Sequence, residues 1–252
     1  MDAGRHSCDS LATVRKALAS KRAEEIRGMF GRIAHRYDLL NRVLSLGQDV
    51  LWRRAIARRV RRARPDLVLD VCTGTGDVAL SLPRTIPVIA SDFCVPMLSL
   101  AATKAQRRGR ALPLFAGDAL HLPLPDGSVG MVTVAFGVRN FENLERGLAE
   151  LVRVIRPGGW LLVLEFSHPH GLFAPLLGWW ARTVPPRVGR WLSGDPEAYT
   201  YLPASVESFP DAAAMSALLS RLGLAGVRAT AQTGGVATLY EGRRAATDGG
   251  MR

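Results

Sequence analysis

From Asp66 onward, short apolar runs rich in β-branched residues alternate with segments of helical periodicity. The strand-like runs are Leu67–Val71, Pro87–Ser91, Leu112–Ala116, Val129–Phe136, Trp160–Phe166, Gly226–Thr230 and Val236–Tyr240. Such alternation is typical of βαβ units, in which helices connect parallel strands and cover the sheet. It predicts an α/β fold with a mostly parallel seven-stranded sheet and helices on both faces.

The helical segments between these runs are Asp77–Leu82, Val95–Arg108, Leu144–Ile155 and Ala212–Leu222. Leu144, Leu148 and Leu151 lie on one face of the third segment, as an amphipathic helix requires. Pro157-Gly158-Gly159 is predicted to stop this helix and turn the chain, since proline and glycine interrupt helices.

A glycine turn joins the first strand to the first helix, in the sequence VLDVCTGTGD from Val68 to Asp77. Gly74 and Gly76 let the backbone approach a ligand closely, because no Cβ blocks it. The turn lacks the third glycine of a dinucleotide fingerprint, and the chain has no GxxxxGK[ST] phosphate loop. Nicotinamide and nucleoside-triphosphate sites are therefore disfavoured.

Three acidic residues stand at consecutive strand ends: Asp70, Asp92 and Asp118. Asp92 can accept hydrogen bonds from both hydroxyls of a ribose, and Asp118 from an adenine amino group. Each has a structural alternative: Asp70 as a carboxylate bonded to backbone N–H groups, Asp92 as a helix N-cap, and Asp118 as part of a Gly-Asp turn. Together they predict an adenosine site at the carboxyl ends of the strands.

The positive charge is concentrated near the N-terminus. Residues 1–65 contain 16 Lys and Arg against six Asp and Glu, so they carry +10 of the net charge of +11. Trp52–Arg64 (WRRAIARRVRRAR) is predicted to be a basic amphipathic helix around Leu51, Ile56 and Val60. A solvated face, anionic lipid headgroups and nucleic acid are the three interpretations of its charge.

The length of 252 residues fits one domain, predicted at 26–245. Within it, 26–65 is expected to form an N-terminal helical lid and 168–210 a helical insertion, with a flexible basic arm at 1–25 and a disordered tail at 246–252. The longest apolar stretch, Leu172–Ala181, is too short to span a membrane. The start does not resemble a secretory signal, so a cytoplasmic protein is expected.

Cys8, Cys72 and Cys94 are widely separated and lie outside any CxxC or His-rich cluster. Because three cysteines in this arrangement suit neither a disulfide framework nor a zinc site, we expect reduced thiols and no metal centre.

Several segments resemble the ubiquinone/menaquinone biosynthesis C-methyltransferases. The resemblance runs from about Met29 to Gly242. It rests on MFGRIAHRYDLLNRVLSLGQDVLW at 29–52, AFGVRN at 135–140, RPGGWLLVLEFSHP at 156–169, YTYLPASVESFP at 199–210 and TGGVAT at 233–238. It implies a Rossmann-like, class I S-adenosylmethionine-dependent methyltransferase that methylates a ring carbon of a polyprenylated quinol, either demethylmenaquinol or its ubiquinone-pathway equivalent.

The resemblance also implies site residues. Thr73, Asp92, Asp118 and Ala119 would touch S-adenosylmethionine, beside Asp70, Gly74 and Gly76 of the turn. Ala135 stands where some relatives have a serine near the cofactor, so a side-chain hydrogen bond is lost there.

Methyl transfer needs an aligned acceptor carbon made electron-rich by removal or polarisation of a phenolic proton. The candidates are Arg139, to hold a quinolate oxygen or a base-acting water, Asn140, to orient a ring hydroxyl, and Tyr37, as a lid contact. A loop salt bridge with a helix N-cap is the structural alternative for Arg139 and Asn140. Further proton acceptors are His35, His121, His168 and His170.

Partners follow from the same reasoning. Trp179-Trp180 and the leucines beside them fit an entry for an isoprenoid tail, a position at the headgroup level, or plain core packing. Peripheral contact with an anionic membrane surface is expected, and binding of nucleic acid is not. Whether the protein forms a homo-oligomer is left open.

The competing functions are a nucleic-acid methyltransferase and a non-catalytic cofactor-binding scaffold. Against the former, AFGVRN replaces the Asp/Asn-Pro-Pro-Tyr motif of amino-methylating DNA enzymes, and no Pro-Cys nucleophile is present.

Overall fold

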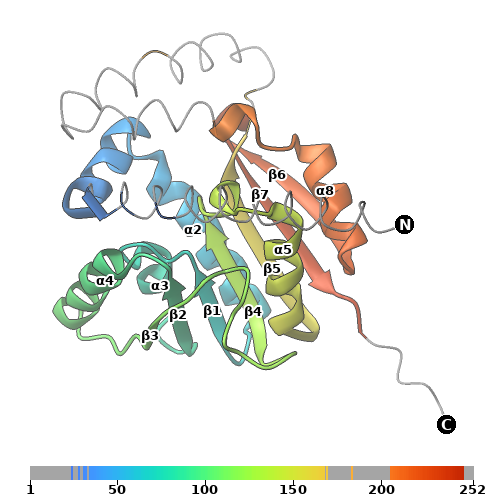
Figure 1. The fold of residues 1–252 in the computed structure, drawn as a ribbon, viewed down its shortest axis with the longest axis horizontal. Coiled ribbons are helices and arrows are strands. Elements are labelled where there is room, and N and C mark those ends of the chain that lie inside the picture. Colours follow the sequence, from blue (N-terminus) through green and yellow to red (C-terminus); the bar gives the residue numbers. More distant parts are fainter. Residues whose placement is uncertain are drawn as a thin grey trace, which may run out of the picture.

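A computed structural model describes residues 24, 28, 31–32, 34–167, 169, 183 and 205–246. Its centre is a seven-stranded sheet of order β3-β2-β1-β4-β5-β7-β6 (Figure 1). The strands are β1 Val68–Val71, β2 Val88–Asp92, β3 Leu114–Ala116, β4 Val129–Ala135, β5 Ile155–Phe166, β6 Leu224–Gln232 and β7 Ala237–Arg244. β1 to β5 pair in parallel, whereas β7 runs antiparallel to β5 and β6. The predicted sheet is confirmed.

Helices cover both faces of this sheet. The described helices are α2 Gln48–Ala63, α3 Asp77–Ser81, α4 Val95–Arg107, α5 Leu144–Val154 and α8 Ala212–Arg221, with 3₁₀ turns η1 Val138–Asn140 and η2 Thr233–Gly235; residues 34–44 are also helical. One core contains Leu148 of α5 and Met215 of α8, packed with Leu69 of β1. The other contains Ile56 of α2, packed with Val68 of the same strand. Alternate side chains of a strand thus enter opposite cores.

The glycine-rich segment after α5 differs from its prediction. The helix ends at Val154, and β5 begins at Ile155 and includes Pro157-Gly158-Gly159. Arg156 precedes a proline, which favours extended backbone. The helix thus ends just before the tripeptide, as predicted, but the tripeptide lies within the strand instead of turning the chain, and it makes an irregularity where the pairing of β4 with β5 shifts register.

The basic helix α2 is less one-sided than predicted. Trp52, Ile56 and Val60 are buried, but Leu51 is exposed. Arg53 is also buried and forms ion pairs with Asp49 (2.9 Å) and Asp77 (2.8 Å). Arg59 pairs with Glu241 of β7 at 2.6 Å. The exposed arginines of this segment are Arg54, Arg58, Arg61, Arg62 and Arg64.

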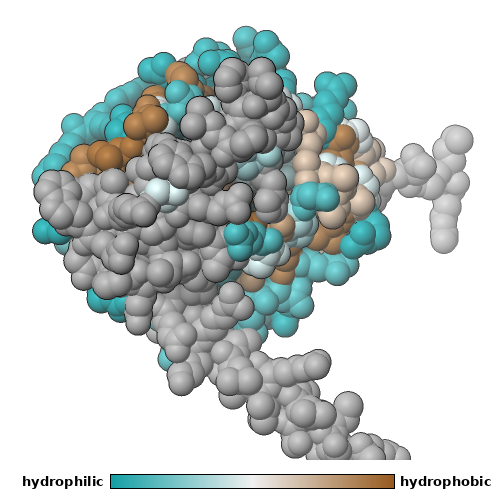
Figure 2. All heavy atoms as spheres, turned by 90° about the horizontal axis from the view of Figure 1, so that it is seen from above, coloured by the Kyte–Doolittle hydropathy of each residue, from teal (hydrophilic) through white to brown (hydrophobic). Residues whose placement is uncertain are grey.

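Large exposed apolar side chains of the described residues belong to two regions. Leu39, Val43, Leu46 and Leu51 lie on residues 34–44 and on the turn and helix that follow, and Val95 begins α4. Hydrophobic surface is visible at the left of Figure 2, the end of the molecule that holds α4 and the N-terminal helices in Figure 1. We call Leu39, Val43, Leu46 and Leu51 the apolar patch.

The predicted arm, insertion and tail lie largely outside the described residues, as do Cys8, His168, His170 and Trp179-Trp180. Among the residues described, none of the helices combines the length and apolar character that crossing a bilayer requires.

Candidate functional site

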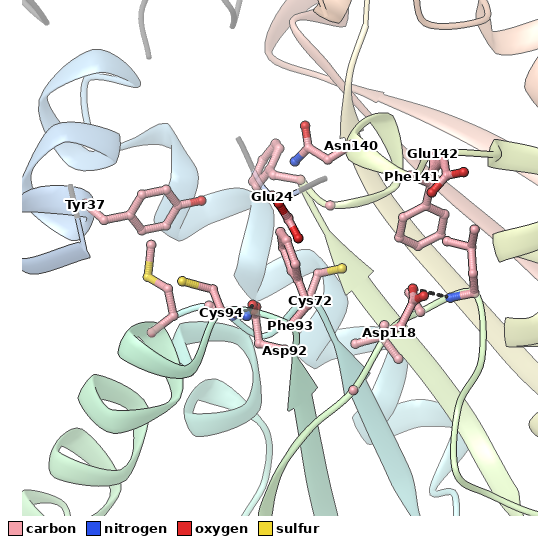
Figure 3. Close-up of a pocket in the computed structure, with 18 residues that line it drawn as sticks. Glu24, Tyr37, Cys72, Asp92, Phe93, Cys94, Asp118, Asn140, Phe141 and Glu142 are labelled. Atoms are coloured by element: carbon pink, nitrogen blue, oxygen red, sulfur yellow. Dashed lines mark hydrogen bonds between the residues drawn. The ribbon is translucent and has the colours of Figure 1, made fainter. Parts of the chain in front are cut away.

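A cavity of about 270 Å³ opens at the carboxyl ends of the parallel strands (Figure 3). Six predicted site residues line it: Tyr37, Gly74, Asp92, Asp118, Ala119 and Asn140. Asp70, Thr73, Gly76 and Arg139 are not among its lining residues. Ligands of open α/β sheets bind at this edge, so the location agrees with an adenosine site.

The glycine turn is shaped by left-handed backbone. Cys72, Gly74 and Gly76 have φ angles of 52°, 56° and 81°. A Cβ on Gly76 would come within 3.1 Å of the Cβ of Ala101, so this glycine permits close packing against α4 rather than contact with a ligand. Gly74, by contrast, faces the cavity.

Asp92 is the most enclosed acid of the cavity wall and is 6% exposed. One carboxylate oxygen accepts the backbone N–H of Gly74 at 2.7 Å, and the other accepts that of Cys94 at 2.9 Å. The N-cap of α4 is Cys94, so Asp92 is not itself the cap. Burial raises the pKa of the Asp92 carboxyl, and these backbone bonds oppose the rise.

Asp70 lies beneath the turn and outside the cavity. Its oxygens accept hydrogen bonds of 2.6 Å from the hydroxyls of Thr73 and Thr133. Burial raises the pKa of Asp70 to about 6, despite the hydroxyl bonds that lower it. This geometry makes Asp70 and Thr73 supports of the turn. It matches the structural alternative for Asp70, whose carboxylate is bonded to the backbone N–H of Ala79 as well as to the two hydroxyls.

Asp118 and Ala119 follow β3. The Asp118 side chain is 60% exposed and accepts the backbone N–H of Leu120 at 2.9 Å, as in a Gly-Asp turn. Its exposure leaves it accessible to a polar group in the cavity. His121 lies 3.4 Å from the same carboxylate and also contacts Arg146. Neither His121 nor the exposed His35 lines the cavity.

Tyr37 closes the cavity from the N-terminal helical segment. A Cβ on Gly74 would lie 3.9 Å from its ring, so the tyrosine covers the turn directly. Tyr37 packs with Ala34, Cys94 and Met97, which fixes residues 34–44 against the start of α4. Burial raises the pKa of the Tyr37 phenol, so this group is a proton donor rather than a base.

The segment after β4 brings Asn140 to the cavity and directs Arg139 elsewhere. Arg139 donates to Glu165 at 2.6 Å and to the carbonyl of Phe136 at 2.7 Å. Its guanidinium also lies 5.2 Å from the centre of the Phe166 ring. The pair is almost fully buried, so the structural alternative of a salt bridge holds for Arg139, although Asn143 is the N-cap of α5.

Several lining residues were not singled out from the sequence. Phe93, Phe136 and Phe141 give the cavity aromatic walls, and Cys72 contributes a thiol. Burial raises the pKa of Cys72, which keeps the thiol protonated. Glu24, inside the predicted arm, also lines the cavity. Phe136 belongs to AFGVRN and Phe141 follows it directly, so this segment could have pointed to both as lining residues. No local sequence pattern points to Phe93.

Known proteins resemble this chain over most of its length. It is 46% identical over 220 residues to the demethylmenaquinone methyltransferase of Thermus thermophilus, covering 86% of this chain and all of that protein. The Deinococcus radiodurans protein of the same name is 45% identical, covering 88% of this chain and 93% of that protein. The Mycobacterium tuberculosis protein is 41% identical, covering 90% and 95%.

Solved structures share the fold. The CurJ carbon methyltransferase superposes with a TM-score of 0.61 at 15% identity, covering 90% of this chain and 71% of that one. A Thermotoga maritima protein described as a S-adenosylmethionine-dependent methyltransferase gives 0.59 at 18% identity, covering 86% and 99%. At this identity the likeness establishes the Rossmann-like methyltransferase fold.

The cavity fits the cofactor of such a fold, S-adenosylmethionine. A buried carboxylate, Asp92, and a side-chain-free backbone position, Gly74, meet in its wall, as binding of an adenosine requires. The ubiE/COQ5 methyltransferase family matches residues 17–244. With these relatives and this cavity, the chain belongs to the ubiE/COQ5 methyltransferase family.

Proposed function

We propose that this chain transfers the methyl group of S-adenosylmethionine to a ring carbon of a polyprenylated quinol. The product is menaquinol from demethylmenaquinol, or the equivalent methylated benzoquinol of ubiquinone synthesis. The observation that carries the proposal is the 41 to 46% identity with proteins named demethylmenaquinone methyltransferase, along 86 to 90% of the chain.

The cofactor half of the proposal uses the strand-end residues. The two oxygens of Asp92 accept backbone N–H groups and keep acceptor capacity for the ribose hydroxyls. Asp118 and Ala119 bind the adenine, and Gly74 leaves room for the ligand. Asp70, Thr73 and Gly76 act through the shape of the turn, since they are not lining residues.

The acceptor half uses the aromatic walls and two polar groups. Phe93, Phe136 and Phe141 exclude water and offer ring faces to a planar quinol. Asn140 orients a ring hydroxyl, and the protonated Tyr37 donates to a ring oxygen. S-adenosylmethionine supplies an activated methyl group when bound, so these residues have chiefly to align the acceptor carbon.

Arg139 acts in this proposal as a positioning residue. Its guanidinium is engaged by Glu165 and by the carbonyl of Phe136, and it does not line the cavity. It thereby fixes the loop that carries Phe136 and Asn140. This role replaces the expected direct hold on a quinolate oxygen.

A membrane surface supplies the acceptor in this proposal. The apolar patch includes Leu39 and Val43, one helical turn apart, and Arg42 and Arg54 are exposed nearby in the sequence. Apolar side chains flanked by arginines suit the interface of an anionic bilayer. The polyprenyl tail would stay in the lipid while the ring enters the cavity.

The test is incubation of the purified chain with methyl-labelled S-adenosylmethionine and, separately, reduced demethylmenaquinol, the benzoquinol precursor, and tRNA or DNA. Label on a quinol, reduced at least tenfold in Asn140→Ala and retained in Asp126→Asn, supports the proposal; Asp126 is an exposed residue outside the cavity lining. Label found only on nucleic acid would overturn it, and binding of cofactor without any transfer would favour the scaffold.

A further inference from the structure

The glycine turn is tied to the N-terminal helical segment by a group of charges that the cofactor site does not use. The hydroxyl of Thr75 donates to Asp38 at 2.6 Å. The ammonium of Lys104, from α4, pairs with the other oxygen of Asp38 and donates to Thr75 at 2.8 Å. Three segments far apart in the sequence therefore meet at one carboxylate.

The same group continues into α3 and α2. Lys104 also donates to Asp77 at 2.7 Å, and Asp77 accepts from Arg53 at 2.8 Å. Burial alone would raise the pKa of Asp77, but Arg53, Lys104 and, to a smaller extent, Arg108 outweigh it, and the net effect lowers the pKa. Asp77 thus stays ionised and holds Lys104 in place for Asp38.

Asp38 is the neighbour of Tyr37, the residue that covers Gly74 and walls the cavity. The adjacent acid binds the turn at Thr75, one residue beyond Gly74. The helical segment is consequently attached by the packing of Ala34 and Tyr37 on α4 and by the polar contacts of Asp38, besides the ion pair of Arg42 with Asp49 of α2. The Asp38 side chain is 36% exposed, so its polar contacts are open to solvent. We therefore expect them to break more easily than the apolar packing of Ala34 and Tyr37.

We propose that Asp38 is a positioning residue that latches residues 34–44 to Thr75 and Lys104, and so sets how long the closed cavity retains S-adenosylmethionine and its demethylated product. Opening this latch lets the helical segment lift Tyr37 from the turn for ligand exchange. The proposal rests on the proposed function for the identity of the ligand and is independent of the acceptor.

The test compares Asp38→Ala with wild type and with Asp126→Ala, which removes an ion pair with Arg153 outside the cavity lining. Three quantities are measured: the hydrogen exchange of residues 34–44 without ligand, the affinity for S-adenosylhomocysteine by calorimetry, and the rate at which S-adenosylhomocysteine is released. In Asp38→Ala, exchange at 34–44 and product release should each become about tenfold faster, while β1 and β4 keep their protection. Asp126→Ala should match wild type.

Lys104→Gln tests whether the two partners form one unit. Asp38→Ala should weaken the binding of S-adenosylhomocysteine less in the Lys104→Gln background than in wild type, because the contact between Asp38 and Lys104 is already lost there. The proposal is overturned if exchange at 34–44 is unchanged, if exchange rises but product release does not, or if Asp126→Ala shows the same effects. Failure of quinol methylation with normal S-adenosylhomocysteine binding would instead refute the proposed function and leave the latch standing.

Discussion

Arg139 and Glu165 form a buried ion pair between the loop after β4 and the carboxyl end of β5, with Nη1 and Oε1 2.6 Å apart. The side chains are 6% and 0% exposed, and Glu165 also accepts the backbone N–H of Phe166 at 2.8 Å. The Arg139 guanidinium is therefore occupied by an internal ion pair that stabilises the structure of the site. Arg139 does not line the cavity, but it holds the loop whose residues Phe136 and Asn140 do.

Removal of one member of this pair should destabilise the protein strongly. Glu165→Gln leaves the Arg139 charge buried without its counter-ion, so the free energy of unfolding should fall by about 3 kcal/mol. Urea denaturation measures it. The Arg139→Met/Glu165→Gln double variant should lose clearly less than the sum of the single losses. Asp126→Asn, which breaks an exposed pair, should cost under about 1 kcal/mol. Equal costs at the two sites would contradict this account.

Asp70 should make stability fall as pH rises. Burial raises its pKa from the ordinary value of 3.8 to about 6 in the fold, so between these values the folded state binds more protons than the unfolded state. Stability contributed by the neutral form is full below about pH 4 and is lost as pH rises through 6, by an amount of the order of 2–3 kcal/mol. Urea denaturation from pH 4 to 7.5 should show wild type losing stability relative to Asp70→Asn. A constant difference would refute the assignment.

Asp92 and Asp118 should differ in their effect on cofactor affinity. Asp92→Asn removes a nearly buried charge that is proposed to bind both ribose hydroxyls, so S-adenosylhomocysteine should bind about 10- to 100-fold more weakly. Asp118→Asn changes a 60% exposed side chain and should cost less than tenfold. Calorimetry on both variants gives the comparison, and the reverse order would show that the adenosine lies differently.

Gly137 and Cys72 should be coupled. A Cβ on Gly137 would meet the Cβ of Cys72 at 2.5 Å and its sulfur at 2.8 Å. Gly137→Ala should therefore lower the free energy of unfolding by about 1–3 kcal/mol through overpacking. Cys72 has φ of 52°, a conformation that glycine adopts freely, so Cys72→Gly should recover part of this loss in the double variant. Thermal or urea unfolding measures the coupling, and purely additive losses would exclude the clash.

The apolar patch should govern binding to lipid. Leu39→Glu and Leu46→Glu place a negative charge on side chains that are 59% and 74% exposed. Each should reduce cosedimentation with phosphatidylglycerol-containing vesicles severalfold. Ser220→Glu adds the same charge on the exposed part of α8 and serves as the matched control. If all three variants lose binding equally, net charge rather than this patch controls attachment.

Most of the fold could be predicted from the sequence, because the patterns that indicate its strands, turns and helices are local. The run LVLDV, the glycines after it and the periodicity of α5 each reflect the preference of a few neighbouring residues. The error at Pro157-Gly158-Gly159 has a local cause too, since such a tripeptide suits both a turn and an irregular strand. Leu51 is predicted to lie on the apolar face of α2, yet it is exposed whereas Trp52, Ile56 and Val60 are buried, because periodicity alone does not fix which edge of an apolar stripe faces the core.

Sequence alone determined the sheet, the glycine turn and the presence of acids at three strand ends, since parallel strands bring their carboxyl ends to one edge. It could not decide that Asp92 enters the cavity while Asp70 lies beneath it. Nor could it show that Arg139 meets Glu165, 26 residues away, or that Asp38 meets Lys104. Those outcomes depend on side-chain direction and on contacts between distant segments, which only the packed tertiary structure fixes.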